Sequence, residues 1–258
     1  MSFGGNGSAS TVARSNHTHP SLLGDGRDNP ATSCAALLTA RPGIASNFYW
    51  LRPSTSTVPF QSYCDMTTDG GGWTLVWSNL RGKRGKPMTE IQWGTAINTP
   101  PLYSGGELVP DLESFMVYTG LKHWPALAPN NLLRYSWAND YGSSIDQSYR
   151  CTFAFTGTNY ILGLIGCTQL VGTVPPGLFT THNNRPFSTY DRDNDGSPEN
   201  CAANYLNTPF WYINCWSGSI NGSGESSGAA NGAHWTGSTS GWGTDNGLGS
   251  GNGWMFVK

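Results

Sequence analysis

The sequence predicts a domain that mixes one short helix with several short strands and long, turn-rich connections. Three patterns indicate this: a helix-like segment at 33–43, short aromatic-rich segments bounded by proline and serine, and a C-terminal region of glycine and serine interrupted by tryptophan. Glycine (34), tryptophan (11) and tyrosine (11) are abundant, whereas apolar residues make up only 37% of the 258 residues. This composition favours irregular backbone held by large aromatic side chains over an aliphatic core.

The first expected element is the helix "SCAALLTARPG" at 33–43. Thr32 or Ser33 can serve as its N-cap, and Pro42 followed by Gly43 stops it. The segment "YILGLIG" at 160–166 is expected to be a buried apolar run. Strands are expected in six further places: 47–53, 59–66, the stretch after Gly72 through Leu75 and Trp77, 130–138, 150–157 and 254–258.

The low charge of the chain excludes several classes of function. Only 12% of residues are charged, against about a quarter in an ordinary soluble domain, and the net charge is −2. There is no basic stripe for nucleic acid, and no apolar run approaches the roughly 20 residues that a membrane helix needs. No nucleophile elbow, H-E-x-x-H or phosphate-binding glycine motif is present. We therefore expect a binding protein and not an enzyme.

The six cysteines fall into three couples along the chain: Cys34 and Cys64, Cys151 and Cys167, Cys201 and Cys215. Many pairings are possible. The chain contains no C-x-x-C motif, which argues against a zinc site. Because each couple closes a short loop, we expect sequential pairing, with each bridge stabilising the fold by about 2–4 kcal/mol. Such disulfides indicate a location outside a reducing cytosol, although residues 1–10 form no signal peptide.

Residues 1–30 are polar and are expected to form a stalk or linker ahead of a recognition domain at 31–258. They contain "SNHTHP", in which His17 and His19 would point to the same side of an extended strand. Three chains around a three-fold axis would then supply six imidazoles to one iron ion, and such pairs resemble the stalks of bacteriophage long tail fibres. In the alternative interpretation, the segment is a flexible leader with two chance histidines.

Three landmarks coincide in the rest of the chain. They are the first cysteine couple followed by "DMTTDGGGWTL", the stretch "FSTYDRDND" followed by "NCA", and "FWYINCW" followed by "SINGS". Together they resemble the fibrinogen-related domain of fibrinogen chains, ficolins and tachylectin-like proteins. The resemblance is weak at about 79–180, where "SNLRGK" and "HWPALAPNNLLRYSW" are similar to intelectins and where Cys151 and Cys167 have no counterpart. It implies an α+β fold with a small disulfide subdomain, a central twisted antiparallel sheet and a loop-rich subdomain that binds calcium and ligand.

The acidic stretch "DRDNDGSPENC" is the candidate metal site. Its opening imitates an EF-hand, but that loop needs a glutamate at its last position, where this chain has Ala202. The resemblance implies instead a calcium site whose ligands are the carboxylates of Asp193 and Asp195 and the backbone carbonyls of Ser197 and Glu199. Closely spaced aspartates also repel one another unless a cation is present. The alternative is a metal-free Asx-type turn, and Asp191 is expected to be a turn residue or to support the ligands from behind.

In ficolin-like relatives the ligand site lies beside this ion, and the resemblance implies the same here. Its residues would be Asn214, Cys215, Trp216, His234 and Tyr205. The peptide bond before Cys215 is expected to be cis, as it often is in those relatives. They usually carry a histidine after this cysteine that helps to recognise an acetyl group, whereas Trp216 would either present a flat face to a sugar ring or pack on the disulfide. His234 either lines the site or is structural.

The sequence therefore predicts a calcium-stabilised carbohydrate-binding domain whose partner is a surface glycan or acetylated sugar. If His17 and His19 hold iron, the protein is the homotrimeric receptor-binding tip of a phage-like fibre on the virion surface, where three weak sites gain by avidity. The alternatives are a secreted, extracellular lectin of the innate-immune type and a structural fibre cap without a ligand. Neither nucleic acid nor membrane insertion is expected in any of these cases.

Overall fold

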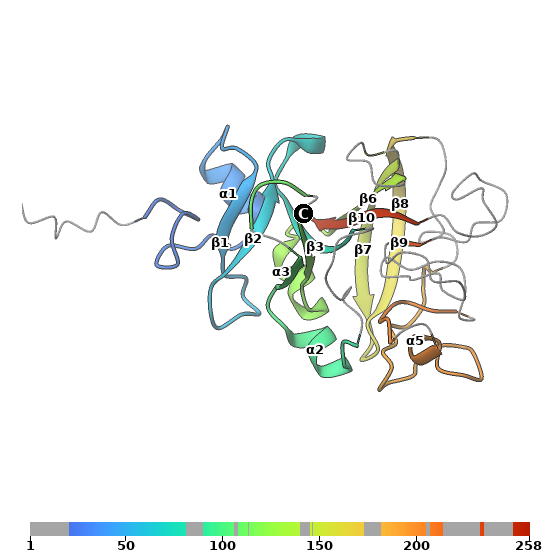
Figure 1. Ribbon diagram of the computed structural model, residues 1–258. Helices are drawn as coiled ribbons and strands as arrows, with labels where there is room; N and C mark the ends of the chain where they lie inside the picture. Colours follow the sequence, from blue (N-terminus) through green and yellow to red (C-terminus); the bar gives the residue numbers. More distant parts are fainter. Residues whose placement is uncertain are drawn as a thin grey trace, which may run out of the picture.

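One large sheet dominates the fold (Figure 1). The computed structural model describes residues 21–80, 90–105, 108–112, 114–139, 145, 147–172, 182–204, 207–213, 233–234 and 250–258. The strands in these segments are β1 (Asn47–Leu51), β2 (Phe60–Asp65), β3 (Trp73–Asn79), β4 (Leu102–Gly105), β5 (Phe115–Tyr118), β6 (Leu132–Asn139), β7 (Gln147–Thr156), β8 (Ile161–Val171), β9 (Ala233–His234) and β10 (Ser250–Val257).

The last strand along the chain lies in the middle of this sheet. The strands run in the order β1-β2-β3-β10-β6-β7-β8, while β4 pairs with β5, β5 pairs with β3, and β9 pairs with β10. Every pairing between these strands is antiparallel. The structure thus confirms the α+β class and the central antiparallel sheet, and the strand expected at 254–258 is the C-terminal half of β10.

Short helices fill the connections between strands. They are α1 (Cys34–Ala40), α2 (Trp93–Asn98), α3 (Trp124–Leu127) and α5 (Cys201–Asn204), with 3-10 turns η1 (Thr68–Gly70) and η2 (Leu121–His123). Of the two expected caps of α1, Ser33 is the one used, because its hydroxyl accepts the backbone N–H of Ala36 at 3.1 Å. The helix stops before Arg41, since a residue that precedes proline avoids the helical conformation. None of the helices in the described segments is long and apolar enough to span a membrane.

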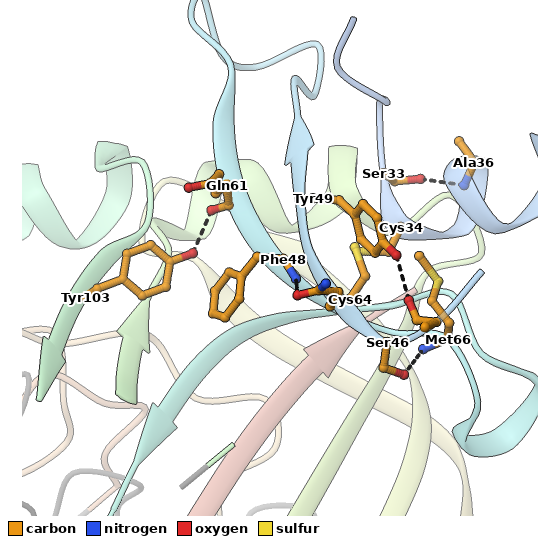
Figure 2. The surroundings of a disulfide bond; sticks show 12 residues. Ser33, Cys34, Ala36, Ser46, Phe48, Tyr49, Gln61, Cys64, Met66 and Tyr103 are labelled. Atoms are coloured by element: carbon orange, nitrogen blue, oxygen red, sulfur yellow. Dashed lines mark hydrogen bonds between the residues drawn. A yellow bond between two sulfur atoms is a disulfide. The ribbon is translucent and has the colours of Figure 1, made fainter. Parts of the chain in front are cut away.

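The first disulfide joins α1 to β2 (Figure 2). The Cα atoms of Cys34 and Cys64 are 5.5 Å apart, and both residues are fully buried. Figure 2 also shows the Tyr103 hydroxyl of β4 directed at β2, where it donates to the Gln61 carbonyl at 2.6 Å. The helix, the β1–β2 hairpin and β4 therefore pack together as the disulfide-containing N-terminal part that the resemblance implies.

The chain that leads into α1 is attached to strand β1 and to the end of α1. The backbone N–H of Trp50 donates to the Gly24 carbonyl at 2.7 Å, and the N–H of Ala31 donates to the Trp50 carbonyl at 3.0 Å. Arg41 forms an ion pair with Asp25 at 2.6 Å. The described part of the predicted linker thus contacts the domain, and the boundary at residue 31 stays a prediction. His17 and His19 lie outside the described residues.

A second disulfide, between Cys151 and Cys167, joins β7 to β8, with the Cα atoms 4.1 Å apart. Cys201 is disulfide-bonded as well. Its expected partner, Cys215, lies outside the described residues. Sequential pairing is therefore confirmed for the first two couples, and the third stays a prediction.

The interpretation of 160–166 as a buried run was wrong in part. The segment begins β8, in which Leu162 and Leu164 are buried but Ile165 is 70% exposed. Alternate side chains of a strand face opposite sides of the sheet, and β8 is the last strand in the sheet order. Only the side that carries the two leucines lies against the main core.

The core is aromatic, as the composition predicts. Trp77 of β3 is fully buried, and its ring centroid lies between 4.9 and 6.4 Å from those of several other aromatic residues. These are Tyr118, Trp124, Phe187, Phe210 and Trp211. They come from the sheet, from α3 and from the segments around the acidic stretch. The cluster therefore connects the central sheet to the candidate site.

A buried histidine makes stability depend on pH. His123 is 2% exposed; its Nε2 lies 3.2 Å from the Asn98 carbonyl, which can only accept, so Nδ1 accepts from the Thr55 hydroxyl at 2.8 Å. Burial lowers the pKa of His123 below its ordinary value of 6.5. The unfolded chain then binds more protons than the native chain as the pH falls below 6.5. The contribution of neutral His123 to stability is therefore complete above pH 6.5 and is lost as the pH falls through the lowered pKa.

We expect urea unfolding to give a smaller free energy at pH 5 than at pH 7.5, with part of this loss due to His123. In His123→Gln the side chain can keep the hydrogen bond to Asn98 without titrating, so the variant should lose less stability on acidification than the wild type does. Equal losses in the two proteins would contradict the assignment.

Candidate functional site

The acidic stretch lies in a loop that is fastened to the core on both sides. Before it, Ser188 and Phe210 exchange two backbone hydrogen bonds, at 2.9 and 3.1 Å. After it comes α5, whose first residue is the disulfide-bonded Cys201. Figure 1 shows α5 and this loop at the opposite end of the molecule from α1. The loop is therefore fixed at its start by the buried pair Ser188 and Phe210 and at its end by α5.

Within the loop, the acidic side chains bind backbone N–H groups that follow them. Asp195 accepts the N–H of Ser197 on Oδ1 at 2.8 Å and the N–H of Cys201 on Oδ2 at 2.9 Å. Asp193 accepts the N–H of Asp195 at 3.1 Å. The contacts to Asp195 and Ser197, each two positions on, are Asx-type turns, and the contact to Cys201 closes a wider loop, so the chain curls around its own carboxylates. Each carboxylate oxygen keeps a second lone pair that is available to a cation.

The electrostatics of Asp195 also favour a cation. Burial raises the pKa of Asp195 and the neighbouring charge of Asp193 raises it further, against the lowering effect of the two N–H donors. A positive ion beside the two carboxylates would offset both the cost of burying the charge of Asp195 and its repulsion from Asp193. Asp193 is exposed and Asp195 is half-buried, so an ion could reach them from solvent.

The donor set fits calcium better than zinc or iron. Among the described residues, no three His, Cys, Asp or Glu side chains gather closely enough to hold a metal by themselves. A site here would need backbone carbonyls as well, such as those of Ser197 and Glu199, and an all-oxygen set of this kind suits calcium. The side chain of Glu199 accepts from Asn204 of α5 at 2.8 Å.

The loop contacts the segment that leads to the predicted ligand residues. The backbone N–H of Gly196 donates to the Ile213 carbonyl at 3.1 Å. Just before Ile213, Trp211 is fully buried, and its carbonyl accepts from Nδ1 of His182 at 2.6 Å. The acidic loop therefore lies directly against the chain that precedes Asn214.

The predicted ligand residues are mostly beyond what the structure describes. Tyr205, Asn214, Cys215 and Trp216 lie outside the described residues, and so does the peptide bond expected to be cis. For His234 only the backbone is described: it lies in β9 opposite Ser250 of β10. These assignments stay predictions.

Sequence reasoning missed how this loop is fixed to α2. Asp191 accepts the backbone N–H of Trp93, the first residue of α2, at 2.9 Å and the hydroxyl of Thr189 at 2.7 Å. The guanidinium of Arg192 lies 4.0 Å from the centre of the Trp93 ring. No local pattern could reveal these contacts, because 98 positions separate Asp191 from Trp93.

The comparisons with known proteins agree with this architecture. The chain is 27% identical to the human fibrinogen alpha chain over 215 residues, which cover 80% of this chain and 24% of that one. It is 27% identical to human ficolin-3 over 218 residues, covering 77% of this chain and 61% of ficolin-3. The chain thus spans only about a quarter of the fibrinogen chain.

A solved structure shows the same fold. The fibrinogen-like globe domain of human ANGPTL2 superposes with a TM-score of 0.63 at 22% identity, covering 89% of this chain and 99% of that domain. The family model of the C-terminal globular domain of fibrinogen beta and gamma chains matches residues 33–90 and 159–244, which together make up more than half of the chain. The unmatched middle contains Cys151, whose bridge to Cys167 the resemblance leaves without a counterpart. The chain therefore belongs to the family of fibrinogen C-terminal globular domains.

Proposed function

We propose that this chain is a calcium-stabilised carbohydrate-binding domain that acts outside the cell, as a lectin of the innate-immune type. The observation that carries the proposal is the hydrogen bond from Gly196 to Ile213, which fixes the acidic loop to the segment before Asn214. Holding a binding segment in place lowers the ordering cost of association. The similarity to ficolin-3 supports a lectin role, and the disulfides support an extracellular location.

In this proposal the ion has a structural role. Asp193, Asp195 and the carbonyls of Ser197 and Glu199 would hold calcium, which supplies charge neutralisation and rigidity and takes part in no bond-breaking step. The residues of this chain do the rest: the Asx-type turns curl the loop, and the hydrogen bond from Gly196 to Ile213 connects it to the ligand segment. The predicted disulfide between Cys201 and Cys215 would add a second connection.

Between the two settings considered for such a lectin, the relatives favour the secreted one. The named relatives are human proteins, and the similarity to ficolin-3 supports the secreted innate-immune lectin. A fibre tip depends on His17 and His19, which lie outside the described residues. We therefore propose the secreted lectin, with a glycan or acetylated sugar as its ligand.

A glycan array probed with calcium and again with chelator tests this proposal. We expect binding to acetylated or other surface sugars that chelator abolishes, and we expect Asp195→Asn to weaken calcium binding by about tenfold or more, because charged ligands set the affinity. Asp25→Asn, which changes an exposed acid beside α1, is the matched control and should bind normally.

Two results would contradict parts of the proposal. Glycan binding that survives both chelator and Asp195→Asn would remove the calcium requirement. A chain that binds calcium but no glycan on a broad array would favour a structural role over a lectin.

A further inference from the structure

Asp191 and Arg192, the two residues just before Asp193, contact two parts of the fold that are far apart in the sequence. The carboxylate of Asp191 accepts the backbone N–H of Trp93 in α2 at 2.9 Å. The guanidinium of Arg192 lies 4.0 Å from the centre of the Trp93 ring and donates through Nη2 to the Asn159 side chain at 2.7 Å. Asn159 belongs to the turn between β7 and β8. The loop is thus fixed to both α2 and the β7–β8 hairpin.

The residue after Asp193 is fixed as well. Asn194 donates from its side chain to the Phe187 carbonyl at 2.7 Å, and its backbone N–H donates to the Ser188 hydroxyl at 3.0 Å. Arg192 and Asn194, the two neighbours of Asp193, are therefore hydrogen-bonded to the rest of the domain, while Asp193 itself is exposed. This arrangement restricts where the backbone of Asp193, and with it the carboxylate, can lie.

The indole of Trp93 connects this support to the core. It is half-buried, and its ring centroid lies 6.3 Å from those of Tyr160 and Phe187. Arg192 lies against the same indole. A stacked guanidinium keeps a fixed plane that a lysine could not reproduce, so the position of Arg192 depends on the flat ring.

We propose that Trp93 and Arg192 are positioning residues for the cation site, holding the Asp193 carboxylate in place by stacking. The inference rests on the proposed function, because it concerns the same site. The charge of Arg192 cannot by itself favour the ion, because a positive charge one residue from a cation ligand repels a cation by Coulomb's law. A net benefit to binding must therefore come from the position that Arg192 imposes on the loop.

The two possible effects of Arg192 have opposite signs, which makes the test sharp. If only its charge matters, Arg192→Met should tighten calcium binding. If positioning dominates, Arg192→Met should weaken binding, and Arg192→Lys should weaken it too although it keeps the charge. Residues that orient metal ligands from behind typically change affinity by about 10–100-fold when replaced, so we expect about tenfold for each.

The experiment is calorimetric titration of the full chain with calcium chloride, using four variants at Trp93 and Arg192 and one control variant. Trp93→Leu removes the flat ring without changing charge and should raise the dissociation constant about tenfold, while Trp93→Phe keeps a ring and should restore most of the affinity. Arg41→Met is the control, an arginine with two hydrogen bonds at the α1 end of the molecule. Circular dichroism and urea unfolding in chelator report whether each variant is folded.

The outcomes separate this inference from the proposed function. Weaker binding by folded Trp93→Leu, Arg192→Met and Arg192→Lys, with recovery in Trp93→Phe, supports it. Unchanged affinity in Trp93→Leu, or tighter binding in Arg192→Met, overturns it while leaving the calcium site intact. A wild-type chain that binds no calcium overturns the calcium site itself, and the inference with it.

Discussion

Replacing Asp65 with alanine is expected to lower the free energy of unfolding by about 3–5 kcal/mol, because it leaves a buried positive charge without its partner. Asp65 Oδ2 lies 2.7 Å from Nη2 of Arg134, whose side chain is only 1% exposed. The guanidinium carbon also lies 4.9 Å from the centre of the Trp73 ring and 4.1 Å from that of Phe256. Because solvent reaches this guanidinium poorly, its charge is left largely uncompensated when the carboxylate is removed. Urea unfolding at neutral pH measures the effect.

Two comparisons make this result specific. Asp69→Ala breaks a pair of the same type, but its partner Arg150 is 34% exposed, so we expect a loss of only about 1 kcal/mol or less. The double variant Asp65→Ala, Arg134→Met removes the stranded charge and should be more stable than Asp65→Ala alone. If Asp65→Ala and Asp69→Ala cost the same, burial would not govern this pair.

The same pair predicts how acid affects the fold. Burial alone would raise the pKa of Asp65, but the charge of Arg134 and the hydrogen bonds from Thr68 hold it at about 2, below the ordinary value of 3.8. The stabilisation from this carboxylate is therefore complete above pH 3.8 and is lost as the pH falls through 2. Arg134→Met removes the charge that lowers this pKa. The difference in free energy of unfolding between the wild type and Arg134→Met should therefore shrink as the pH falls from 3.8 to 2.

Replacing Trp77 with alanine is expected to cost about 3–5 kcal/mol as well, through the cavity that a buried indole leaves. Trp77 is 0% exposed and contacts rings from both the sheet and the candidate-site segments, including Phe187, Phe210 and Trp211. We therefore expect weaker calcium binding together with the loss of stability, measured by urea unfolding and calorimetry on the same sample.

Trp50 provides the matched control for this variant. It lies in β1, at one end of the sheet, and is half-exposed, so Trp50→Ala should cost clearly less and leave calcium binding unchanged. Equal losses in the two variants would show that the aromatic cluster around Trp77 has no special role.

Local patterns in the sequence predicted much of the fold, but they could not predict contacts between residues that are far apart in the sequence. The cap at Ser33, the strand that contains Cys64 and the first two cysteine couples follow from patterns within a few tens of residues. The partnership of Asp65 with Arg134 spans 69 positions and depends on which strands become neighbours. The exposure of Ile165 likewise follows from the place of β8 at the end of the sheet, which hydrophobicity alone cannot reveal.

The candidate site divides in the same way. The composition singles out the acidic stretch, and in the structure Asp193 and Asp195 each accept a backbone N–H group within it. Its role as a calcium site stays a prediction. Its attachment to α2 through Asp191 and Arg192 could not be inferred, because nothing near Trp93 marks it as a partner of a loop 98 residues away.

The central place of β10 has a consequence for how the protein is made. Strands β1 to β3 and β6 to β8 leave the ribosome earlier and can form two separate antiparallel units from local contacts. They join only when the later β10 inserts between β3 and β6, a closure over long sequence distances that slows folding. Until then, both inner edges are open to pairing with other chains, so synthesis of this domain passes through a stage at which chaperones would matter most.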